Sequence, residues 1–174
     1  MFLTKEEQVL TEEYLQQGYV IRPVANQKAL ESIRQIIYNL AEQNAATKKS
    51  TDVNSCLNHI HESITVEQLN DFRLKIIRGI NAESEFRERY FNLARPYLDT
   101  LVGNELSMQL RVNLSVQLPG DESSLLPVHA DTWSGDSPYE VVVWLPLVDY
   151  YNTKSMYFLP PKAANNLSDD YCIY

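Results

Sequence analysis

The chain has 174 residues, of which 44% are hydrophobic and 22% charged, a composition typical of one soluble globular domain of ordinary size. Its net charge of −8 and its scattered Lys and Arg residues argue against nucleic acid and against an anionic membrane surface as partners. No stretch approaches the ~20 apolar residues that cross a bilayer, and the start lacks the features of a signal peptide. Cys56 and Cys172 form no CxxC pair, so we expect a reducing, cytoplasmic location.

The first part of the chain carries helical patterns. Thr4 and Glu7 form a capping-box pattern ahead of a helix that Gly18 is placed to end. A short extended segment follows over residues 19–24, and Asn26 is placed to cap a second helix. The apolar residues of this second helix recur at spacings of three and four: Leu30, Ile33, Ile37 and Leu40.

Two further helices are expected beyond residues 46–58, a polar and aperiodic stretch that predicts a loop. Thr65 and Gln68 favour a cap at the start of the first. Its apolar stripe is Leu69, Phe72, Ile76 and Ile80. The second begins at about Glu83, and Pro96 should kink it. Its inward-facing residues are Phe86, Tyr90, Leu93, Tyr97 and Leu101.

The pattern changes at about residue 106. Residues 108–118 alternate between apolar and polar side chains, which is the period-two pattern of a β-strand. Short apolar runs separated by turn residues follow at 125–128, 140–148 and 155–159. Helices followed by closely spaced strands predict an α+β domain whose β part is a sandwich or barrel. We therefore expect a helical part over 1–105 and a β part over 106–174, within one structural domain.

The polar face of the long expected strand has two interpretations. Its members are Gln109, Arg111, Asn113, Ser115 and Gln117. The face is either a solvated outer surface or part of a barrel lumen that holds a polar ligand. In the second case, Arg111 would meet a carboxylate with bidentate geometry.

His129-Ala130-Asp131 is the strongest local feature. On an extended segment, residues i and i+2 point to the same side, so the imidazole and the carboxylate converge. Two His and one carboxylate on one face of the metal are the ligands of non-haem Fe(II) sites, which leave positions open for a co-substrate and dioxygen. Taken alone, such a triplet is more often an ordinary surface pair or hydrogen-bonded pair than a metal site.

The residues around this triplet carry a family resemblance. Residues 114–149, which read LSVQLPGDESSLLPVHADTWSGDSPYEVVVWLPLVD, resemble Fe(II)/2-oxoglutarate-dependent oxygenases of the phytanoyl-CoA-hydroxylase type. More narrowly, the stretch resembles a bacterial subgroup encoded with surface-carbohydrate biosynthesis genes. Residues 153–161, TKSMYFLPP, are similar to the next strand of that family. The specific match covers about residues 106–161.

The resemblance implies a double-stranded β-helix, a jelly roll of the cupin-like kind, with helices packed outside it. It also implies Fe(II) held by His129 and Asp131, and 2-oxoglutarate as the co-substrate. In such proteins an aromatic residue at the position of Trp144 often lies beside the co-substrate pocket, although a core tryptophan is an equal interpretation.

Further candidate contacts follow from the same resemblance. Gln117 and Asn113 lie on the strand that commonly offers polar contacts to the co-substrate, and Arg111 lies on the same face. Thr132 and Trp133 follow the triplet and either line the substrate mouth or pack the turn.

The chain departs from the family after the triplet. The family's third iron ligand is a late His, followed by an Arg or Lys that binds 2-oxoglutarate. Here, none of the three His follows His129, no Arg follows Arg111, and Lys154 and Lys162 are the only lysines after Asp131. The jelly roll is therefore expected to be incomplete at its C-terminal end, in a truncated chain or a short homologue.

Two other groups are candidates to replace the missing ligand. His59 and His61 have the same spacing as the triplet but precede an expected helix, where surface histidines are the commoner case. Asp169 and Asp170 offer carboxylates in a tail that reads as a fraying end.

Three functions remain open on these grounds. The first is an Fe(II)/2-oxoglutarate-dependent oxygenase, a hydroxylase of a small molecule such as a sugar or sugar nucleotide, or a truncated form of one. The second is a non-catalytic cupin-like binding or assembly module that has lost its metal site. A third and weaker one is a cupin-type isomerase. An incomplete barrel would also expose strand edges, which favours a homo-oligomer.

Overall fold

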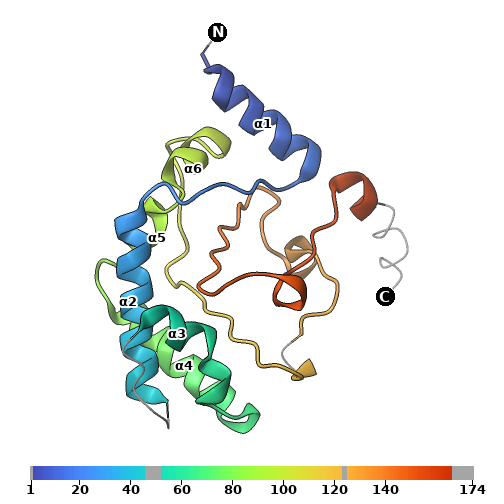
Figure 1. The fold of residues 1–174 in the computed structure, drawn as a ribbon. Helices are drawn as coiled ribbons and strands as arrows, with labels where there is room; N and C mark the ends of the chain where they lie inside the picture. Colours follow the sequence, from blue (N-terminus) through green and yellow to red (C-terminus); the bar gives the residue numbers. More distant parts are fainter. Residues whose placement is uncertain (1, 46–51, 123–124, 166–174) are drawn as a thin grey trace. The chain divides into compact units, whose positions relative to one another are not determined.

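The computed structural model describes residues 2–45, 52–122 and 125–165 (Figure 1). The chain divides into two compact units. One is formed by the described residues of 1–25, 94–107 and 150–174, and the other by those of 26–93 and 108–149.

In the first unit, helix α1 (Lys5–Gln17) packs against helix α6 (Arg95–Leu101). The predicted capping box is confirmed: the Glu7 backbone N–H donates to Thr4 Oγ1 at 3.2 Å, and the Thr4 N–H donates to Glu7 Oε2 at 2.6 Å. Gly18 ends α1 as expected, because its φ of 79° lies in the left-handed region that glycine adopts without strain.

Longer-range contacts tie the expected extended segment 19–24 into this unit. Arg22 forms an ion pair with Glu13 of α1 at 2.6 Å. The Tyr97 hydroxyl of α6 donates to the Pro23 carbonyl at 2.9 Å. A short 3-10 turn, η4 (Asn152–Lys154), belongs to the same unit.

The second unit is built on four helices (Figure 1). They are α2 (Gln27–Asn44), α3 (Val53–Asn58), α4 (Val66–Ala82) and α5 (Phe86–Asn92). Helix α2 contacts each of the other three, and α4 contacts α5. The described residues of this unit also form the 3-10 turns η1 (Ile60–Glu62) and η3 (Asp131–Ser134).

The core of this unit consists mainly of the apolar stripes of α2 and α4. Its residues on these helices and on α5 include Ile33, Ile37, Ala41, Leu69, Phe72, Ile76, Ile80 and Phe86. The stripes predicted from the spacing are therefore confirmed at most positions. The two helices approach each other closely at Gly79, because a Cβ atom there would lie 2.5 Å from Leu40 Cδ2.

Two predictions about the helices are wrong. The expected loop over 46–58 contains α3, which is capped by Asp52 as its carboxylate accepts the Ser55 N–H at 2.7 Å; residues 46–51 lie outside the described residues. Pro96 does not kink one long helix. Two helices form instead, and Pro96 lies in the first turn of α6, where an N–H has no partner within the helix.

The expected α+β fold with a jelly roll is also wrong, because the structure contains no β-strand within 2–45, 52–122 and 125–165. The segments predicted as strands, 108–118, 125–128, 140–148 and 155–159, run as non-helical chain without ladders (Figure 1). The described part of the protein is therefore a helical structure that carries long irregular segments.

The predicted alternation nevertheless persists over residues 108–118. Val112 and Leu118 are buried, with 5% and 8% of their surfaces exposed. The polar residues of the opposite face are exposed: Gln109, Arg111, Asn113, Ser115 and Gln117. Leu110 departs from the pattern, since 80% of its surface is exposed.

Side chains of the helices take the place of neighbouring strands. The Asn81 amide of α4 donates to the Val112 carbonyl and accepts the Val112 N–H, both at 2.9 Å. The hydroxyl of Tyr90 on α5 donates to the Val143 carbonyl at 2.5 Å. The exposure of the polar face agrees with the alternation, but the predicted strand is wrong, because a side-chain pattern carries no information about which groups bond to the backbone.

Arg87 of α5 likewise bonds to the backbone of the segment 108–118, at the residues before Val112. Its Nη2 donates to the Met108 carbonyl at 2.9 Å and its Nε to the Gln109 carbonyl at 3.2 Å.

Among the helices that the structure describes, none combines the length and the apolar content that crossing a bilayer requires.

Candidate functional site

The side chains of His129 and Asp131 face each other. Nε2 of His129 lies 3.6 Å from Oδ1 of Asp131. Both side chains are open to solvent, with 46% and 57% of their surfaces exposed. The predicted convergence is present, but it occurs on an exposed turn and not at the mouth of a β-barrel.

The turn η3 fixes the position of Asp131. Ala130 is extended, with φ −121° and ψ 138°, and Asp131 begins the 3-10 turn. The turn is closed by Gly135, whose φ is 97° and whose N–H donates to the Thr132 carbonyl at 3.3 Å. Asp131 is therefore held by its backbone, although it does not lie on the extended segment assumed from the sequence.

A contact with the backbone determines which ring nitrogen of His129 carries the proton. Its Nδ1 lies 2.7 Å from the Pro127 carbonyl oxygen, and a carbonyl oxygen only accepts hydrogen bonds. Nδ1 must therefore carry the proton, which leaves the lone pair of a neutral ring on Nε2, the atom that faces Asp131. Metal-bound histidines typically have this arrangement, in which the other ring nitrogen donates to a carbonyl or carboxylate.

The separation of the two donor atoms fits one shared metal ion. With bonds of about 2.1 Å to each atom, a donor separation of 3.6 Å corresponds to an angle of roughly 118° at the metal. This angle is wider than the ~90° of an octahedral site, so a shift of about 0.6 Å by one exposed side chain would complete the fit. With that shift, His129 Nε2 and Asp131 Oδ1 could occupy two neighbouring coordination positions of one metal ion.

A third ligand is not found among the described residues, where no group of three or more His, Cys, Asp or Glu side chains is placed to hold a metal ion. The rings of His59 and His61 lie 6.1 Å apart, and His59 Nδ1 is 2.9 Å from the Ser55 carbonyl oxygen. Asp169 and Asp170 lie outside the described residues. The described residues therefore hold no complete set of iron ligands, and the role of His129 and Asp131 in binding iron stays a prediction.

The remaining predicted site residues lie on three segments of the second unit: 108–118, η3 and 140–148. Arg111, Asn113 and Gln117 are exposed on the segment 108–118. Thr132 is exposed within η3, and 43% of the surface of Trp144 is exposed. Their contact with a co-substrate stays a prediction.

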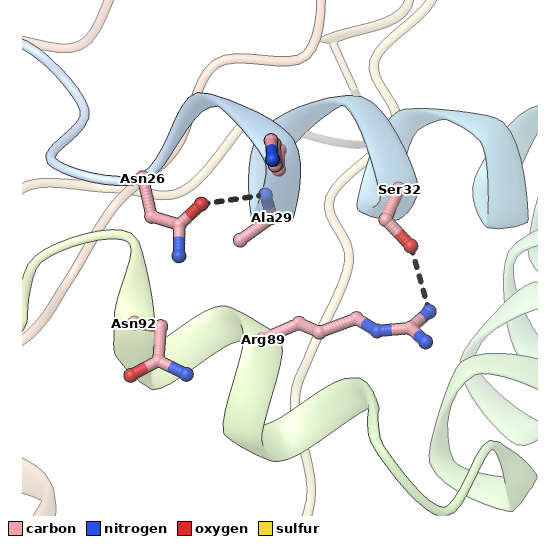
Figure 2. A pocket seen from close by; sticks show the side chains of 6 residues that line it. Asn26, Ala29, Ser32, Arg89 and Asn92 are labelled. Carbon is pink, nitrogen blue, oxygen red and sulfur yellow. Dashed lines mark hydrogen bonds between the residues drawn. The ribbon is translucent and has the colours of Figure 1, made fainter.

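Sequence patterns did not predict a second group of polar residues, which the fold brings together between α2 and α5. Lys28 and Arg89 are far apart in the chain, and both line one cavity. Asn26 lines the same cavity, and Figure 2 shows it together with Arg89. The one available signal was Asn26, which was expected only to cap α2. Its side chain does so, accepting the Ala29 N–H at 3.0 Å.

Comparison of the chain with protein families, with curated proteins and with solved structures returned no match. The family resemblance drawn from residues 106–161 therefore stays a prediction.

Proposed function

We propose that the chain binds a divalent metal ion, Fe(II) by the chemistry of its donors, through His129 and Asp131. The observation that carries the proposal is the 3.6 Å approach of His129 Nε2 to Asp131 Oδ1, with the other ring nitrogen held by the Pro127 carbonyl. One imidazole and one carboxylate suit Fe(II).

We further propose that this metal serves an oxygenase dependent on 2-oxoglutarate. Bound together, Fe(II) and 2-oxoglutarate would supply the oxidation chemistry. The chain's own contribution is to hold the metal and leave its other positions accessible, since both ligand side chains are exposed. The cationic side chain of Arg111 is the proposed partner of a co-substrate carboxylate, with Asn113 and Gln117 as polar neighbours.

The proposed substrate is a small molecule of carbohydrate type, a sugar or sugar nucleotide. This part of the proposal rests only on the sequence resemblance.

An anaerobic titration with Fe(II) in the presence of 2-oxoglutarate tests the proposal. Wild type should develop the weak visible charge-transfer band of an Fe(II)–2-oxoglutarate complex. His129→Ala and Asp131→Ala should lose the band, because each removes one of two protein ligands. His61→Ala is the matched control, since it removes an exposed imidazole outside the pair and should leave the band unchanged.

Absence of the band in wild type, or an equal band in His129→Ala, would overturn the proposal of an oxygenase.

The second candidate function, a binding or assembly module without catalysis, is favoured by the lack of a third ligand within the described residues. It predicts that no 2-oxoglutarate is consumed even when Fe(II) is supplied in excess.

A further inference from the structure

The cavity between α2 and α5 has a volume of about 320 Å³. It is lined by Asn26, Lys28, Ala29, Ser32, Arg89 and Asn92. Figure 2 shows Arg89 reaching from α5 along the underside of α2, with Asn92 following it on the same helix. The cavity is widely open to solvent, and its volume lies at the lower end of the range of small-molecule sites, above what a bare ion needs.

The charges that line the cavity are all positive. Lys28 and Arg89 contribute two cations, and none of the lining residues is acidic. This reverses the sign of the whole chain, whose net charge is −8. A local concentration of positive charge in an acidic protein favours an anionic ligand.

The guanidinium of Arg89 is held in place from two sides. Nη1 donates to Ser32 Oγ at 2.6 Å (Figure 2), and Nη2 pairs with Glu85, the residue directly before α5. Glu85 does not line the cavity, although it offsets part of the Arg89 charge. Lys28 adds a second cation on α2, so the cavity retains a net positive charge.

The neutral residues define the rest of the ligand. The amides of Asn26 and Asn92 and the hydroxyl of Ser32 supply both donors and acceptors, which suit hydroxyl groups. The first turn of α2 also lies at this cavity, and its partial positive charge adds to that of the two cationic side chains.

From the two cations, the polar lining and the volume, we infer that this cavity binds a small phosphate monoester, with Lys28 and Arg89 on the phosphate and the Asn and Ser side chains on a hydroxylated body. Nothing in this inference depends on His129, Asp131 or a metal ion.

Calorimetric titration of the metal-free full chain at constant ionic strength tests the inference, with inorganic phosphate and glycerol 3-phosphate as probes. Glycerol 3-phosphate should bind saturably, and more tightly than inorganic phosphate. Lys28→Gln and Arg89→Gln should each weaken its binding by about tenfold or more, because each removes a charge-assisted contact. Lys28 has the exposed side chain, so its replacement keeps the test valid if Arg89→Gln disturbs α5.

Arg95→Gln is the matched control. It removes the same charge from a side chain that also pairs with a carboxylate one turn away, Asp99 at 3.5 Å, but Arg95 does not line the cavity. The Arg95→Gln variant should bind glycerol 3-phosphate as tightly as wild type does. Absence of saturable binding in wild type, or equal binding by wild type, Lys28→Gln and Arg89→Gln, would overturn the inference.

Discussion

At the scale of single residues, the amide of Asn81 has an unusual task. It satisfies both the N–H and the carbonyl of Val112, a residue with 5% of its surface exposed, and it also donates to the Ile77 carbonyl of its own helix. A buried backbone group without a partner costs about 1–3 kcal/mol. The attachment of the segment 108–118 to α4 therefore depends strongly on this one side chain.

Asn81→Leu, which keeps the size and removes the hydrogen bonds, should lower the free energy of unfolding by about 2–4 kcal/mol. Urea unfolding followed by circular dichroism measures it. Asn39→Leu makes the same change on an exposed side chain of α2 and should cost less than about 0.5 kcal/mol. Equal losses in the two variants would contradict the role of Asn81.

The Cys56 thiol should be unreactive in the folded chain. Burial raises its pKa from 9.0 to about 11, and the neighbouring Glu42 carboxylate, which accepts from Sγ at 3.6 Å, adds to the effect. Because the folded-state pKa is the higher one, the resulting stabilisation is complete below pH 9 and is lost as the pH rises from 9 to 11.

Iodoacetamide labelling measures this shift in a Cys172→Ser background, where Cys56 is the sole thiol. At pH 8 the folded chain should hold roughly 100-fold less thiolate than an ordinary cysteine, and labelling should be slower in proportion. Unfolding in urea should restore the normal rate. The same labelling rate with and without urea would contradict the prediction.

At the scale of elements, the contact of α2 with α4 depends on the missing side chain at Gly79. A methyl group there would lie 2.5 Å from Leu40 Cδ2 and 2.8 Å from Leu40 Cδ1. Alanine is the better helix former by about 1 kcal/mol, so propensity and packing act in opposite directions at this position.

A double-mutant cycle separates the two effects. In wild type, the clash with Leu40 should offset the propensity gain of Gly79→Ala. In a Leu40→Ala background, the same change should stabilise the chain, by about 1 kcal/mol more than in wild type. Identical effects of Gly79→Ala in both backgrounds would show that Leu40 does not limit the approach of the helices.

The helices and their caps were predictable because their signals are local. Thr4, Asn26 and the stripe from Leu69 to Ile80 each act within a few positions of the chain. The end of α5 was not predictable from the apolar spacing, which continues unbroken through Leu93 to Tyr97. Proline in a first helical turn and proline inside a helix look alike in such a pattern.

At the scale of the whole molecule, the predicted β core failed for a different reason. Alternation over 108–118 specifies an extended chain with two faces, but a sheet also needs a second strand at hydrogen-bonding distance. Here Asn81, Arg87 and Tyr90 bond to the backbone of the irregular segments instead. Such contacts join residues tens of positions apart, so no local sequence pattern predicts them.

The local part of the candidate site was predictable, and the contacts with more distant residues were not. The triplet His129-Ala130-Asp131 predicted that two side chains converge, and they do. The bond from His129 Nδ1 to the Pro127 carbonyl could not be predicted, because it depends on the path of the chain before the triplet. The cavity lined by Lys28 and Arg89 was not predictable either, since it depends on the packing of α2 against α5.

The central claim is that His129 offers the lone pair of Nε2 to a metal shared with Asp131. Nitrogen-15 NMR of the three imidazoles, with and without Zn²⁺ as a diamagnetic probe, tests it most directly. His129 and His59 should both be protonated at Nδ1, since each Nδ1 faces a carbonyl oxygen. His129 alone should show a Zn²⁺-dependent shift at Nε2, and this shift should vanish in His129→Ala. A Zn²⁺ shift at His59 or His61 alone, or none at any histidine, would contradict the account.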